Sequence, residues 1–295
     1  MLARLFAVLA PVLITAGLGY GWARSGHAYP TDFIAKLVLN IATPCLILST
    51  LSRAQLDRHA FAEMAIACVL VTVAMGVVGL IASRMSGKDW RVLVPGFLFP
   101  NSGNMGLPMS LYAFGEHGLA LAVAFFMVLS VGHFSIGPAI SGSAPPLKKV
   151  FSNPILISLV LALPLVIFDI DLPRWLDNSL DLLAGMTIPL MLLTLGVSLA
   201  SIRVHHLGSG MLLGGLRILC GAGVGWLVGV LLGLPPLSLG VLVMQSAMPV
   251  AVFNYLFAVR ANRSPEDVAS LVLCSTLLSF VFLPLLLLWL LPASS

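Results

Sequence analysis

The stretch Phe99–Tyr112, which reads FPNSGNMGLPMSLY, interrupts a hydrophobic span of the chain with two prolines, two glycines and two asparagines. Pro100 and Pro108 lack the backbone N–H that a helix uses, and Gly103 and Gly106 relax the backbone. Inside a bilayer such backbone is tolerated only where it is buried in protein or lines a watery cavity. The stretch therefore predicts a broken membrane helix whose break binds a solute; the alternative is a kinked structural helix or an ordinary loop.

The composition around this stretch is that of an integral membrane protein. Hydrophobic residues make up 59% of the chain and charged residues 9%, whereas a soluble domain carries about a quarter charged residues. The four cysteines fall in apolar spans without metal-binding spacing, so neither disulfides nor a metal site is predicted. We expect one all-α membrane domain with no cofactor, no metal and no nucleic-acid partner.

The hydrophobic segments predict ten membrane helices, since a crossing takes about 20 apolar residues. The first segment also resembles a signal peptide, but the internal repeat described next needs it as a membrane helix. The expected segments are Leu5–Tyr20, Phe33–Leu51, Phe61–Ala82, Val92–Phe114, Leu119–Ile140, Phe151–Phe168, Leu180–Ala200, Met211–Leu232, Leu237–Val259 and Val268–Leu291.

The segments form two groups of five that share proline positions. Three pairs recur in order at spacings of 143, 145 and 141 residues: Pro11 with Pro154, Pro44 with Pro189, and Pro108 with Pro249. A repeat with an odd number of helices inserts its second copy upside down, which is typical of secondary transporters. We expect repeats over residues 1–140 and 151–295, joined by a short cytoplasmic linker, 141–150, with discontinuous and crossed helices four and nine.

The basic residues predict the orientation. Four of them lie on the side of the N-terminus and ten on the opposite side. The positive-inside rule then places both termini outside the cell and the linker in the cytoplasm, in a multi-pass protein of the inner membrane. Insertion thus accounts for the net charge of +4 without an anionic partner.

The two breaks predict a binding site for an anion. Helix N-termini offer unpaired amides and positive dipole ends, so the amides of 106–110 and 249–252 are the expected donors. Polar side chains near the breaks add neutral hydrogen-bonding groups, although such groups also cap breaks or bridge helices. The candidate substrate-binding residues are Asn101, Ser102, Gly103, Asn104, Gly106, Pro108, Gln245, Ser246, Pro249 and Asn254.

Threonines beside two further prolines are candidates for the wall of the cavity. Thr43 precedes Pro44, and Thr187 stands two residues before Pro189. Hydrogen bonding of the hydroxyls back to their own helices is an equal alternative.

Arg217 is the basic residue placed well inside a span. One reading has its side chain reach the cytoplasmic surface, and the other makes it an attractant for an anion. The carboxylates lie near span ends, so no relay through a buried acid is visible, and coupling to Na⁺, coupling to H⁺ and uncoupled transport stay open. His133 is expected to be a packed polar residue, and no enzyme site is predicted.

The string Asn101–Pro108 and the region around Pro249 and Asn254 resemble the auxin efflux carrier family, over essentially the whole chain. The resemblance implies the fold of bile acid/sodium symporters, with a transport domain moving like an elevator, a site at Asn101, Asn104, Pro108, Pro249 and Asn254, and a homodimer. The short linker is similar to that of prokaryotic permeases, including putative malonate carriers.

We therefore expect a secondary transporter of small organic anions, namely carboxylates, working by alternating access. Two alternatives stay open: a sodium-coupled symporter of larger amphipathic anions, and a membrane sensor that does not transport.

Overall fold

The computed structural model describes residues 2–53, 58–142, 146–168, 170–201 and 206–290. Their regular structure is helical, as predicted, and they contain no β-strand. The first half comprises α1 (Leu2–Arg24), α2 (Thr31–Leu37), η1 (Val38–Ala42), α3 (Thr43–Arg53), α4 (Arg58–Ser86), α5 (Trp90–Leu98), η2 (Ser102–Gly106) and α6 (Leu107–Ser141). The second comprises α7 (Leu147–Phe151), α8 (Pro154–Phe168), α9 (Arg174–Ala184), α10 (Thr187–Ser201), α11 (Leu207–Leu231), α12 (Pro236–Ser246), α13 (Val252–Ala261) and α14 (Pro265–Leu290).

The helices have the length and composition of membrane spans. Seven helical stretches of the described residues are long and apolar enough to cross a bilayer, and α8, α12 and α13 are shorter apolar helices. Large apolar side chains such as Val73, Val77 and Ile81 of α4 are exposed on the outside of the bundle. Since lipid is the solvent that accepts such a surface, this agrees with an integral membrane protein.

Both helices that were predicted to be broken are broken, which confirms that part of the prediction. The fourth segment consists of α5, an extended stretch from Phe99 to Asn101, the π-helical turn η2 and the start of α6. The ninth consists of α12 and α13, with 247–251 between them. Part of the predicted linker, 143–145, and Leu291 at the end of the last predicted segment lie outside the described residues.

The long helix α6 contains a second break, at Gly115. Its φ of 71° and ψ of −164° are not helical, and they divide a half-helix over 107–114 from a long helix over 116–141. Only glycine adopts this conformation readily. In the long part, every residue from Gly118 to Met127 is buried, so this helix lies at the centre of the bundle.

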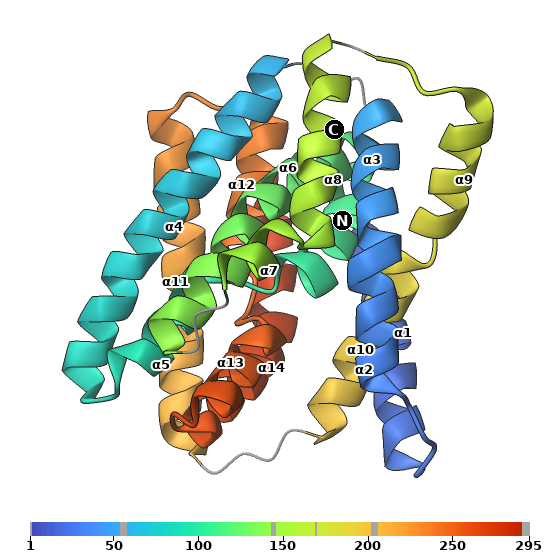
Figure 1. Cartoon of the computed structure of the whole chain (residues 1–295). Coiled ribbons are helices and arrows are strands. Elements are labelled where there is room, and N and C mark those ends of the chain that lie inside the picture. Colours follow the sequence, from blue (N-terminus) through green and yellow to red (C-terminus); the bar gives the residue numbers. More distant parts are fainter. Residues whose placement is uncertain (1, 54–57, 143–145, 169, 202–205, 291–295) are drawn as a thin grey trace.

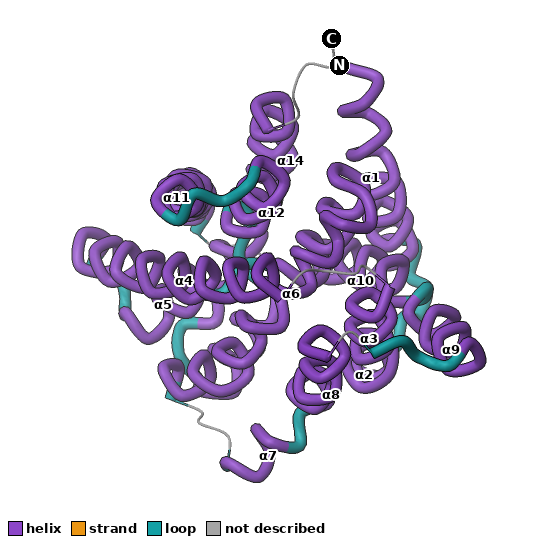
Figure 2. The backbone as a smooth tube through the Cα atoms, turned by 90° about the horizontal axis from the view of Figure 1, so that it is seen from above, coloured by secondary structure: helices purple, strands orange, loops and turns teal. Residues whose placement is uncertain are grey.

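The helices gather in two groups on either side of α6. Figure 2 shows α4, α5, α11, α12 and α14 on one side and α1, α3, α8, α9 and α10 on the other, and Figure 1 shows the same division from the side. Within the second group α1 packs on α10, and α3 packs on α8. The α1–α10 crossing is close because glycines face backbone: a Cβ at Gly196 would overlap the carbonyl oxygen of Ala16.

Candidate functional site

The two broken helices cross at their breaks and hold each other by backbone hydrogen bonds. Pro100 and Val250 form an isolated antiparallel bridge. The amide of Asn101 donates to the carbonyl oxygen of Pro249 at 2.7 Å, and the amide of Ala251 donates to that of Phe99 at 3.2 Å. Two interrupted membrane helices thus satisfy part of their exposed backbone in each other, as buried backbone requires.

The half-helices resume earlier than the sequence predicts after the first break and later after the second. The expected free amides at 106–110 are incorrect at their start, because η2 already winds the chain from Ser102, the Gly106 amide donates to the Asn101 carbonyl at 3.0 Å, and the Leu107 amide donates to the Ser102 carbonyl. At the second break the amides of Val250 and Ala251 are also paired, with Ser275 Oγ and the Phe99 carbonyl. Pro108 does lie in the first turn of α6, whereas Pro249 lies in the extended crossing segment, before α13 begins at Val252. The unpaired amides of the helix starts therefore belong to the residues from Ser102 and from Val252 onward.

Asn254 of α13 fastens the crossing with its side chain. Its Nδ2 donates to the Phe99 carbonyl at 3.1 Å, while its Oδ1 is buried without a hydrogen-bond partner. The Nδ2 of Asn101, on the opposite strand of the crossing, is likewise buried and unpaired. Asn104 is half-buried one turn into η2. The structure thus brings the predicted residues Asn101, Pro249 and Asn254 together, and it leaves unpaired polar atoms among them.

Gln245 and Ser246 close the C-terminal end of α12 against the half-helix of α6. The Nε2 of Gln245 donates to Ser110 Oγ at 3.2 Å, and its Oε1 is unpaired. A Cβ at Gly106 would overlap this Oε1, so glycine is needed there for the close approach. The Oγ of Ser246 is also buried and unpaired. Gly103, another predicted residue, packs under the ring of Phe126.

Arg217 is buried, and this excludes the reading in which it reaches the cytoplasmic surface. Its side chain is 1% exposed. The Nη1 donates to the carbonyl oxygen of Ser246 at 2.8 Å, and Nε has no partner. No carboxylate of the described residues lies within ion-pair distance of it. Arg217 therefore places a permanent positive charge at the C-terminal end of α12, beside the crossing.

The two candidate threonines begin α3 and α10. Both Thr43 and Thr187 are fully buried, and neither hydroxyl has a hydrogen-bond partner, so the alternative of back-bonding to the helix is not realised. Their neighbours Pro44 and Pro189 are half-buried and exposed, respectively. That these residues complete a substrate cavity stays a prediction.

Two cavities border the stretch from α2 to α3, one at α3 and the other at η1. The Arg53 cavity, of about 600 Å³, is lined by α3, by α6 on both sides of Gly115, by α9 and by the start of α10, and its lining includes Arg53, Tyr112, Glu116, His117, Asp181 and Pro189. The Arg260 cavity, of about 220 Å³, is lined by η1, α8, α13 and α6, and its lining includes Asn40, Phe134, Asn153, Phe253, Phe257 and Arg260.

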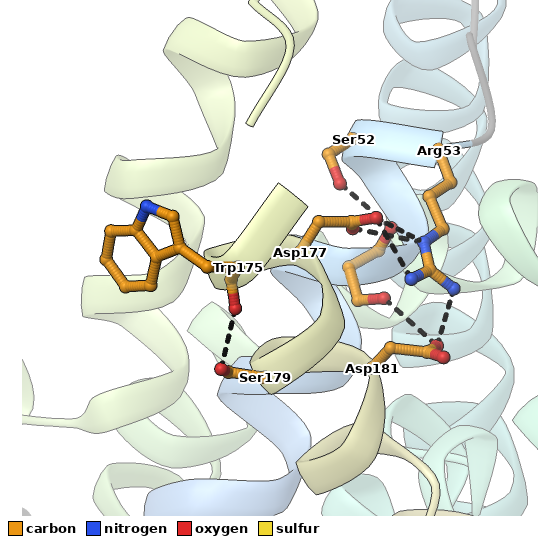
Figure 3. Close-up of polar contacts among 7 residues, drawn as sticks. Ser52, Arg53, Trp175, Asp177, Ser179 and Asp181 are labelled. Atoms are coloured by element: carbon orange, nitrogen blue, oxygen red, sulfur yellow. Dashed lines mark hydrogen bonds and ion pairs between the residues drawn. The ribbon is translucent and has the colours of Figure 1, made fainter. Parts of the chain in front are cut away.

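An ion-pair cluster closes one rim of the Arg53 cavity. Arg53, at the end of α3, points between two carboxylates that lie one turn apart on α9 (Figure 3). Its Nε donates to both carboxylate oxygens of Asp177 at 3.0 and 3.1 Å, and its Nη1 lies 2.7 Å from Asp181 Oδ1. The sequence analysis did not assign a role to this cluster, because the pairing joins residues more than 120 positions apart.

His133 is a packed polar residue, as predicted, but its position at the crossing was not predicted. It is 7% exposed and stacks on Phe99, with ring centroids 4.7 Å apart, at the crossing itself. No motif marks it, since its place depends on how α6 packs on the break.

Comparisons with known proteins agree with these features. A family described as membrane transport protein matches residues 5–137 and 144–287. A transporter of Methanothermobacter thermautotrophicus is 28% identical over 290 residues, which cover 93% of this chain and 94% of that protein. A transporter of Methanocaldococcus jannaschii is 25% identical over 300 residues, covering 94% and 96%. Neither relative has an assigned substrate in its description.

Proposed function

Because the chain belongs to the membrane transport protein family, which includes the auxin efflux carriers, we propose that it is a secondary transporter of small organic anions, in particular carboxylates. It works by alternating access at the crossing of the broken helices, in the inner membrane, with both termini outside and without a resident metal or cofactor. The crossing segments and the cavities on either side of them support this proposal.

The helix packing supports ten membrane segments in two inverted repeats. The seven long spans, the short helix α8 and the broken pair of α12 and α13 make nine segments, and the break at Gly115, which divides segments four and five, makes ten. Packing partners recur with the repeats exchanged: α1 packs on α10 and α3 on α8, while α4 packs on α5 and α11 on α12. Counted from the Pro100–Val250 bridge, Asn104 and Asn254 hold equivalent positions, each four residues after a bridge residue, as the proposed repeat requires.

The two groups of helices support an elevator-like motion. The group of α4, α5, α11, α12 and α14 carries most of the crossing, and α1, α3, α8 and α10 form the group against which it slides. Each cavity is bounded on one side by helices of the second group, α3, α9 and α10 at the Arg53 cavity and α8 at the Arg260 cavity. The other side is formed by α6 and, at the Arg260 cavity, by α13, which we take to move with the first group. A displacement of the first group along the second would enlarge one cavity while it closes the other, which is what alternating access requires.

The single observation that carries the choice of an anion is the burial of Arg217. A charge in the interior costs several kcal/mol unless it is paired. The Ser246 carbonyl supplies only the partial negative charge of a helix C-terminus, about half an elementary charge. The excess positive charge favours an anion at the neighbouring crossing, where the amides of Ser102 and Val252 begin their half-helices.

A binding and uptake series tests the proposal. Purified protein is heated with acetate, malonate, malate, benzoate, taurocholate or the cation choline, each with and without Na⁺. We expect at least one carboxylate, and not choline, to raise the melting temperature, and we expect the same acid to accumulate unchanged in proteoliposomes. Stabilisation that requires Na⁺ and occurs only with taurocholate would favour the sodium-coupled alternative. If no acid binds or is taken up, the proposed function is wrong.

A further inference from the structure

His133 is a titratable side chain enclosed by aromatic rings at the crossing. It stacks on Phe99 at 4.7 Å with the planes 10° apart, and on Phe134 at 5.3 Å. Phe253 and Phe257 of α13 stand edge-to-face to it, at 6.2 and 5.5 Å. The Nε2 atom is buried, and the Asn254 side chain beside the imidazole lacks the geometry of a hydrogen bond to it. A buried polar atom without a partner is uncommon and calls for an explanation.

No charged side chain of the described residues contacts this imidazole. The polar neighbour of His133 is the amide of Asn254. The crossing after α5 presents Phe99, and α5 carries Arg91 at its exposed start. On α13 the titratable residues are Tyr255 and Arg260, and Arg260 is exposed at its cavity. On α6 itself, Glu116 and His117 lie more than four turns away, and η1 and α8 carry no titratable side chain.

His133 lies between the crossing and the aromatic lining of the Arg260 cavity. Its stacking partner Phe99 supplies the carbonyl that accepts from both the Ala251 amide and Asn254 Nδ2. On its other side, Phe134, Phe253 and Phe257 line the Arg260 cavity. A change of charge on the imidazole therefore acts on the residues that hold the two half-helices together.

We propose that His133 is the proton site of the carrier and that one proton binds together with one substrate carboxylate. This inference rests on the proposed function. In the absence of substrate, the apolar enclosure disfavours the imidazolium, just as it disfavours a lone carboxylate. When both are present, each charge offsets the burial of the other, and the aromatic faces stabilise the cation further. The proton adds to the free ring nitrogen of the neutral imidazole and leaves from it when the acid leaves.

The test uses the acid of the panel above that binds most tightly. The wild type should bind it more tightly as the pH falls, by up to about tenfold per pH unit, because one proton is taken up with each anion. The protein in weakly buffered solution should take up one proton per acid bound. In His133→Phe, which keeps the ring packing, and in His133→Gln, which keeps a polar side chain, both effects should disappear while the acid still binds.

His117→Gln is the matched control, since His117 is an exposed histidine on the same helix, at the Arg53 cavity. It should retain the wild-type pH dependence. If both His133 variants retain the pH dependence and the proton uptake, or if the wild type shows neither while it binds an acid, the inference is wrong and the proposed function stands. If no acid of the panel binds to the wild type, the proposed function has failed, and this inference with it.

Discussion

The C-terminal ends of α5 and α12 are packed in the same way but differ in chemistry. α4 approaches α5 through Gly76 and Gly79, and α11 approaches α12 through Gly221 and Gly225. The first contact is apolar, with Phe97 and Leu98 against α4. The second carries the buried Arg217, which donates to the last carbonyl of α12. Close packing through two glycines is thus common to both contacts, whereas the buried charge of Arg217 belongs to the contact of α11 with α12.

The charge difference is removed by Arg217→Met, the change with the largest expected effect. Affinity for the transported anion should fall by about 2–5 kcal/mol, the cost of removing a buried charge from its partner. Stability should change little, because relief of the buried charge's desolvation offsets the loss of its hydrogen bond to the Ser246 carbonyl. Isothermal titration and thermal unfolding measure the two effects.

Arg217→Lys, which keeps the charge, is the control and should retain part of the affinity. Unchanged anion binding in Arg217→Met would mean that the charge at α12 has no part in substrate recognition.

The close glycine packing at the two helix contacts is tested by adding a methyl group to one glycine of each contact. In Gly221→Ala the Cβ would overlap the carbonyl oxygen of Ser246, which is backbone and cannot rotate away. We expect a loss of about 3 kcal/mol, at the upper end of overpacking effects. In Gly76→Ala the nearest atom is Leu98 Cδ2 at 3.0 Å, the end of a side chain that can move. Its loss should be clearly smaller in denaturation experiments; equal losses would contradict the contrast.

The crossing itself is loosened by Asn254→Ala. The change removes the side-chain bond to the Phe99 carbonyl, which still accepts from the Ala251 amide. A loss of about 1 kcal/mol in stability is expected for one buried hydrogen bond of which the acceptor stays partly satisfied. Hydrogen exchange at Ala251 should accelerate in the same variant. Asn104→Ala, at the half-buried counterpart, should leave the exchange at Ala251 as in the wild type.

The smallest effect is expected at the rim of the Arg53 cavity, where the two halves differ again. Counted from Pro44 and Pro189, the counterpart of Arg53 is Ser198, which has no charge. Arg53→Gln removes the ion pairs with Asp177 and Asp181, in which the arginine side chain is 43% exposed. Such pairs contribute at most about 1 kcal/mol, screened by salt. Melting temperatures at low and high salt should converge for wild type and variant; a loss that salt does not reduce would contradict a surface ion pair.

Much of the architecture was predictable because it depends on local rules. Proline and glycine in apolar spans mark broken helices wherever they lie, and hydropathy marks spans regardless of their neighbours. The break at Gly115 also follows a local rule, since its φ of 71° suits glycine. The sequence analysis nevertheless placed a boundary between two spans there from hydropathy and did not single out Gly115. The recurrence of Pro108 and Pro249 at one spacing stays a prediction of counting along the chain, and it did not indicate which residues meet: the contact at the crossing joins Pro100 to Val250.

By itself, the sequence determined the membrane class, the two broken helices and the pool of polar residues near them, because each follows from the polarity and backbone preferences of neighbouring residues. Only the tertiary structure decided that Arg217 is buried against α12, that Asn254 fastens Phe99, and that His133 sits in an aromatic enclosure at the crossing. Those facts depend on contacts between distant residues: the hydrogen bonds of Arg217 and Asn254 join residues 29 and 155 positions apart in the chain. Burial and partnership of a polar side chain are properties of the assembled helices, and no local pattern encodes them.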